Sequence, residues 1–170
     1  MIRLALIPAA VVALLPMPLT AQGSLKVGMQ NMRLAMEICL RKYRSEETLR
    51  QGFAQAGFAL RQSHDADVLD FDAPGVSGGF RTSGPEGYCH MASGDVPLAL
   101  AEEMGLKLAQ MLFPGMVTQG HPERDMNQPV APCDGLSIFA PQTLIRVTYS
   151  AAGNSGDCLN DGTSAIAIQM

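Results

Sequence analysis

The amino-acid sequence predicts a two-layer α+β fold, in which a helical hairpin and one further helix pack on an antiparallel sheet in the order ααβββαβββ. The first supporting observation is that the spacing of apolar residues changes from three or four before Phe58 to two after it. The second is that helical and strand segments form separate blocks along the chain. The third is an even number of cysteines behind an export-type leader, which predicts two disulfides.

The N-terminal residues have the layout of a secretory signal peptide. A positive start at Arg3 precedes an apolar run over residues 4–15 and a segment of small residues, and cleavage is expected after Ala21 or Gly23. A retained membrane anchor would need about 20 apolar residues, whereas three prolines interrupt this stretch. We therefore expect residues 1–23 to be removed from an exported protein.

The remaining residues, 24–170, have the size and composition of a single globular domain. The chain is 47% hydrophobic and only 16% charged, which excludes a disordered protein. The formal net charge is -4 for the whole chain, and the loss of Arg3 with the leader would make it -5. This charge repels phosphate backbones, so a nucleic-acid partner is excluded, and no membrane span is expected after processing.

Three segments have the spacing and the boundary residues of helices. Residues 25–43 carry large apolar side chains every three or four positions, which indicates a helix with one buried face. The second helix is expected to be capped by Ser45 and to end at Gly57. The third is expected to be capped by Asp95, with Pro97 in its first turn, and to run to about residue 112.

Alternating apolar and polar residues predict three short strands on each side of the third helix. Their expected positions are residues 68–73, 76–82, 88–92, 136–140, 143–150 and 163–169. Between the two blocks, we interpret the proline-rich residues 114–132 as a partly ordered loop of the kind that often carries recognition. The alternative is that this segment contains a short strand around residues 116–119.

The four cysteines can pair in three ways, and the faces on which they are expected to lie favour one of these pairings. Cys39 lies beside the apolar stripe of the first helix, and Cys89 shares the inner face of its strand with Met91, so we expect these two cysteines to pair. Cys133 and Cys158 flank a pair of strands and are expected to form the second bond. The wide separation of all four cysteines argues against a zinc site, whose ligands usually come in close pairs.

A weak candidate site consists of His90, His121 and Arg124. A small hydrolase or a transition-metal protein would use the two histidines together with nearby acids. Ser77 lies in a G-x-S-x-G pattern, but the residues after it do not begin a helix, so we interpret the glycines as part of a bent strand. Alternation also predicts that His90 faces away from Cys89, and thus away from the core.

Methionine-based copper binding is a further alternative, because thioethers and imidazoles suit that metal. Met29, Met32 and Met36 lie on the apolar face of the first predicted helix, whereas Met91 lies on a strand. Methionine fills irregular cores readily, so we interpret these residues as core. No cofactor is predicted.

A basic cluster lies at the junction of the first two helices and consists of Arg41, Lys42 and Arg44, with Arg50 further on. It would suit an anion or an acidic partner, although basic residues at the end of a helix also complement the helix dipole. We expect the chain to act by binding a cell-envelope component or an extracellular protein. Enzymatic activity through His90 and His121 is the alternative function.

Overall fold

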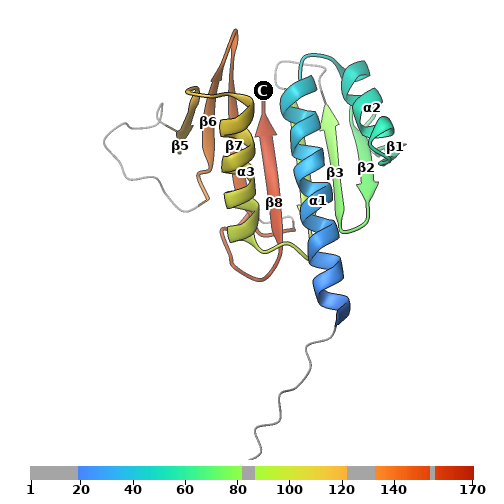
Figure 1. The fold of residues 1–170 in the computed structure, drawn as a ribbon. Helices are drawn as coiled ribbons and strands as arrows, with labels where there is room; N and C mark the ends of the chain where they lie inside the picture. Colours follow the sequence, from blue (N-terminus) through green and yellow to red (C-terminus); the bar gives the residue numbers. More distant parts are fainter. Residues whose placement is uncertain (1–18, 82–86, 122–132, 154–155) are drawn as a thin grey trace, which may run out of the picture.

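The computed structural model describes residues 19–81, 87–121, 133–153 and 156–170. Within these ranges, three helices cover one face of an eight-stranded antiparallel sheet (Figure 1). The helices are α1 (Leu19–Lys42), α2 (Glu46–Gln55) and α3 (Leu98–Leu112). The strands are β1 (Ala59–Gln62), β2 (Leu69–Ala73), β3 (Val76–Arg81), β4 (Tyr88–Ser93), β5 (Val117–Gln119), β6 (Leu136–Ala140), β7 (Thr143–Ser150) and β8 (Ser164–Gln169).

The sheet order is β1-β2-β3-β4-β8-β7-β6-β5, so the last strand of the chain lies in the middle of the sheet. Each neighbouring pair is antiparallel, and β4 pairs with β8 in the register Cys89↔Ile168 and Met91↔Ile166. The predicted two-layer α+β architecture is therefore confirmed. None of the described helices is long and apolar enough to cross a membrane.

The sheet contains two short edge strands beyond the six that the sequence pattern predicts. β1 has a single large apolar residue, Leu60, and therefore lacks the alternation by which a strand is recognised. It exists because its backbone pairs with β2. β5 corresponds to the short strand that was the alternative for residues 116–119, so the loop interpretation is wrong for residues 117–119. The predicted loop over residues 122–132 lies outside the described ranges.

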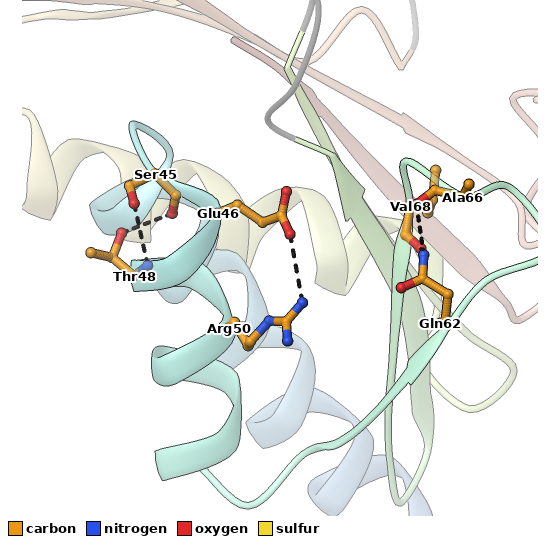
Figure 2. Close-up of polar contacts among 7 residues, drawn as sticks. All are labelled: Ser45, Glu46, Thr48, Arg50, Gln62, Ala66 and Val68. Atoms are coloured by element: carbon orange, nitrogen blue, oxygen red, sulfur yellow. Dashed lines mark hydrogen bonds and ion pairs between the residues drawn. The ribbon is translucent and has the colours of Figure 1, made fainter.

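The helix boundaries agree with the capping residues at α2 but not at α3. Ser45 is the N-cap of α2, where its hydroxyl accepts from the Thr48 backbone N–H and its carbonyl accepts from the Thr48 hydroxyl (Figure 2). The predicted Asp95 cap of α3 is wrong, because the N-cap is Pro97 and no side chain bonds there. The Asp95 backbone N–H instead donates to the Ser93 hydroxyl. α1 begins at Leu19, so the expected cleavage positions fall within its first five residues.

The core lies between the helices and the inner face of the sheet, and an aromatic cluster fills its α2 end. Phe53 of α2 stacks on Phe71 and Phe80 with ring centroids 4.1 Å and 5.3 Å away, and Phe58 meets Phe53 edge-on. A Cβ on Gly78 would lie 2.4 Å from the Phe71 ring, so this position requires glycine. Gly78, at the variable position between Ser77 and the last glycine of the G-x-S-x-G pattern, therefore serves packing.

Both predicted disulfides are confirmed: Cys39 bonds to Cys89, and Cys133 bonds to Cys158. The first joins α1 to β4 inside the core, where both cysteines are fully buried. The second joins the segment before β6 to the segment before β8, and its Cys133 carbonyl accepts from the Tyr149 backbone N–H of β7. From sequence separations of 50 and 25 residues, loop-closure entropy gives contributions of roughly 4 and 3.5 kcal/mol to stability.

A close contact between Gly105 and Tyr149 sets the position of α3 on the sheet. Tyr149 of β7 is buried, and a Cβ on Gly105 would lie 2.1 Å from its hydroxyl oxygen and 3.0 Å from its Cζ. Among the described residues, this hydroxyl has no hydrogen-bond partner. Burial, together with the nearby Glu102 carboxylate, raises the pKa of Tyr149 above its usual range. The tyrosine therefore serves as a neutral packing group.

We expect Gly105→Ala to lower the free energy of unfolding by about 1 to 3 kcal/mol, because the new methyl group overlaps the Tyr149 hydroxyl. Adding Tyr149→Phe should recover part of that loss, since it removes the overlapping oxygen and breaks no hydrogen bond among the described residues. Urea unfolding with the disulfides intact measures both effects. Gly94→Ala, at a position with open space, is the matched control. Equal losses for the two alanine variants would contradict the proposed overlap.

We also expect mild reduction to open the two disulfides in a fixed order. Cys158 is exposed and Cys133 is partly exposed, whereas Cys39 and Cys89 are fully buried, so a reductant should reach the Cys133–Cys158 bond first. Alkylation and peptide mass spectrometry should therefore label Cys133 and Cys158 earlier. The singly reduced protein should lose roughly 3.5 kcal/mol of stability. Simultaneous labelling of all four cysteines would show that the buried bond is not protected.

Candidate functional site

The two candidate histidines do not come together. His90 lies on β4 and faces away from the helices, as alternation predicts, whereas His121 is buried just after β5. Three strands separate β4 from β5 in the sheet, so the two backbones are about 19 Å apart at the usual strand spacing. The third candidate, Arg124, lies outside the described residues. His90 and His121 are therefore too far apart to belong to one site.

His90 instead belongs to a polar row on the open face of the sheet. Asp70, Gly79 and His90 are in register across β2, β3 and β4. A Cβ on Gly79 would lie 3.3 Å from the Asp70 Oδ1 and 3.3 Å from the His90 Cε1, so those two atoms are at most 6.6 Å apart. Ser77 is the diagonal neighbour of His90 on this face. Among the described residues, no hydrogen bond joins Ser77, Asp70 and His90.

The surroundings of His90 favour its neutral form. Burial lowers the pKa of His90 below its ordinary value of 6.5, although the Gly79 backbone and the Asp70 carboxylate act in the opposite direction. A neutral imidazole next to a carboxylate is an acid–base pair. The row lies on an open β-sheet face, however, and its third member is a glycine. We therefore do not assign it a reaction.

Three of the four methionines that are candidate copper ligands lie in the core. Met32, Met36 and Met91 are fully buried in the core, as the sequence interpretation expects. No group of three or more histidine, cysteine or acidic side chains in the described part of the chain is arranged to hold a metal ion. Met29 differs from the other three because it lines a surface groove.

The strongest candidate site is a cationic cleft where α1 and α3 end. Its volume is about 570 Å³. The walls come from the end of α1, the turn into α2, the end of α3 and the β6–β7 turn, which are far apart in sequence. Its lining residues are Leu40, Arg41, Lys42, Tyr43, Arg44, Ser45, Thr48, Leu112, Phe113 and Pro141. This volume lies in the range of known ligand pockets.

Two of the three basic side chains in the cationic cleft are held in place without neutralisation. Arg44 donates from Nη2 to the Pro141 carbonyl at 3.1 Å and from Nε to the Tyr43 hydroxyl at 3.2 Å. The aliphatic part of Lys42 lies against Gly52, where a Cβ would be 2.8 Å from the lysine Cδ. Within the described ranges, neither Lys42 nor Arg44 forms an ion pair with a carboxylate. Among the described residues, no carboxylate neutralises these two cations.

The third basic side chain, Arg41, is partly neutralised. Its Nε donates to the Glu37 carboxylate at 2.9 Å. Three helix ends lie at the cleft. The C-terminal ends of α1 and α3 each contribute about half a negative elementary charge, and the N-terminal end of α2 contributes about half a positive one. The two negative helix ends offset about one elementary charge and the positive end of α2 adds about half of one, so the helix ends alone do not neutralise three cations. Complementing the helix dipoles therefore does not consume the charge of the basic cluster.

The sequence pattern identified only part of this site. Arg41, Lys42 and Arg44 appear in the sequence as a basic cluster, but Arg50 does not join them. It forms an ion pair with Glu46 at 3.7 Å on the other side of α2 (Figure 2). The apolar wall from α3 and the β6–β7 turn has no local signal, because it joins the cluster only through folding.

No protein-family model, curated protein or solved structure matches the chain. Its class therefore rests on its own structure, which is a disulfide-stabilised α+β domain. Two disulfides are consistent with an exported protein, because such bonds persist in oxidising compartments.

We expect Asp70→Asn to lower the pKa of His90 further, because the carboxylate is one of the groups that favour the protonated ring. Since the pKa of His90 in the folded state is already below 6.5, the unfolded state takes up its proton first as pH falls. The free energy of unfolding should therefore decrease as pH falls from about 6.5 towards the folded-state pKa. NMR titration of the His90 ring measures the shift. Asp72→Asn, one row away on β2, is the control, and a pKa of His90 that rises in Asp70→Asn would refute the electrostatic interaction between these two side chains.

Proposed function

We propose that this protein is an exported binding domain, and that the cationic cleft binds an acidic segment of a partner protein in the cell envelope or outside the cell. The observation that carries the proposal is the pair of ordered, unneutralised cations, Lys42 and Arg44, in a cleft of about 570 Å³. The signal-like N-terminus and the two disulfides support export.

The polar lining of the cleft suits carboxylates. Arg44 is fixed by its contacts with Tyr43 and Pro141, so less side-chain entropy is lost when it binds an anion. The Ser45 hydroxyl accepts from the Thr48 backbone N–H, so its own proton can be donated to a carboxylate next to the two cations. A carboxylate in this position would form charge-assisted hydrogen bonds, which are the stronger kind.

The apolar lining favours a protein segment over a free inorganic anion. Leu112 and Phe113 at the end of α3 are half-buried and face the same cleft as the cations. A segment that combines acidic and apolar side chains would neutralise the cations and cover these two side chains at once. A small inorganic anion would leave the apolar wall in water.

Fluorescence anisotropy with a labelled peptide of alternating glutamate and leucine tests this proposal. The exported protein should bind this peptide and should bind the matching glutamine–leucine peptide at least about tenfold more weakly. The double variant Lys42→Gln with Arg44→Gln removes both cations. It should lower the affinity for the acidic peptide by at least about tenfold, and the remaining affinity should depend less on salt concentration.

The matched control is Lys26→Gln with Arg61→Gln, which changes the net charge equally at exposed positions outside the cleft. It should change the affinity less than about twofold, because distant surface charges are screened. If the two double variants weaken binding equally, net charge rather than the cleft accounts for the affinity, and the proposal fails.

A further inference from the structure

A second surface depression, the methionine groove, lies between α1 and α3 and has a volume of about 320 Å³. Its lining residues are Met29, Arg33, Leu100, Glu103, Met104, Lys107, Leu108 and Met111. The charged members are exposed, so the groove opens on the side of the helices that faces away from the sheet. The two helices lie side by side in Figure 1.

The floor of the methionine groove is apolar and flexible. Met29, Met104 and Met111 contribute three thioether side chains, and Met111 is 55% exposed. Methionine adapts its shape to different apolar partners, and it is common on surfaces that bind amphipathic helices.

The methionine groove and the cationic cleft lie end to end. α1 and α3 run in the same direction, since Val96 just before α3 lies against Gly28 of α1, and both helices end at the cleft. On α3, Leu108 and Met111 line the groove, and the next residue, Leu112, lines the cleft. On α1, two turns separate the two linings, which is about 10 Å.

The charges along this surface differ between its two ends. In the groove, Lys107 pairs with Glu103 and Arg33 lies 3.9 Å from Glu37, so these cations already have partners. At the cleft, Lys42 and Arg44 have no carboxylate partner within the described ranges. A complementary partner therefore needs acidic residues at one end only, and apolar residues along the rest.

We propose that the methionine groove binds the apolar face of an amphipathic helix of the partner protein, whose acidic first turn lies in the cationic cleft. This inference rests on the proposed function of the cleft. Acidic residues are favourable in the first turn of a helix. A helix that begins at the cleft would run antiparallel to α1 and α3, with its positive end near their negative ends.

Within the part of the chain that the structure describes, no helix is a suitable occupant. Among the described helices, only α2 has acidic residues in its first turn, and its apolar residues Leu49 and Phe53 are fully buried. The apolar N-terminal segment carries Arg3 and no carboxylate, so its charge does not complement the cleft. We therefore assign the groove to a segment of another protein.

The probe is a synthetic helical peptide with glutamates in its first turn and leucines at positions i, i+3, i+4 and i+7. Two comparison peptides have the same composition, one with the leucine positions scrambled and one with the glutamates in the last turn. The exported protein should bind the first peptide at least about fivefold more tightly than either comparison peptide. Circular dichroism should show that the peptide gains helix on binding.

Met111→Gln should lower the affinity for the first peptide about fivefold and leave the affinity for the scrambled peptide unchanged. The matched control is Leu159→Gln, because Leu159 is also 55% exposed but lies outside the groove. Both substitutions replace an exposed apolar side chain by a neutral polar one, so neither is expected to unfold the protein.

The outcomes separate the methionine groove from the cationic cleft. If the three helical peptides bind equally and only Lys42→Gln with Arg44→Gln weakens them, the groove is overturned and the cleft stands. If Met111→Gln weakens binding of the first peptide but Lys42→Gln with Arg44→Gln does not, the acidic first turn of the partner helix does not lie in the cationic cleft, and the inference fails. If no acidic peptide binds, both the groove and the proposed function fail.

Discussion

The antiparallel pairing of β4 with β8 is the contact on which the rest of the structure depends. It joins the strands that follow α2 to those that follow α3, and so makes a single sheet with one inner face to cover. The Cys39–Cys89 bond attaches α1 to β4, and the contact between Gly105 and Tyr149 places α3 on β7. The two helices consequently lie side by side, and both end at the same edge of the molecule.

This arrangement produces a local positive site on a protein that is negative overall. At physiological ionic strength, charges are screened within about 8 Å, so an acidic partner is not drawn in by the distant surface. It meets the cations of the cleft only at contact distance. Affinity would then depend on close complementarity and on apolar contacts, which is the combination that the cationic cleft and the methionine groove offer together.

The candidate residues show where sequence patterns succeed and where they stop. Alternation correctly separates Cys89 from His90, because adjacent residues of a strand must point to opposite faces. It does not show that Gly79 brings Asp70 close to His90, because that contact depends on the register of three strands. The basic cluster is visible in the sequence. Its apolar wall is not, since Phe113 reaches it only when α3 lies beside α1.

The sequence by itself determined the two-layer architecture and the extent of α2, and it favoured the correct one of three possible disulfide pairings. These features follow from local periodicity, from capping at Ser45 and from the face on which each cysteine lies. Only the tertiary structure decided that β8 lies between β4 and β7, that β1 and β5 extend the sheet, and that Lys42 and Pro141 share a cleft. The physical reason is that backbone pairing and cavity walls join segments far apart in the chain, and local side-chain patterns do not specify which distant segment will be the neighbour.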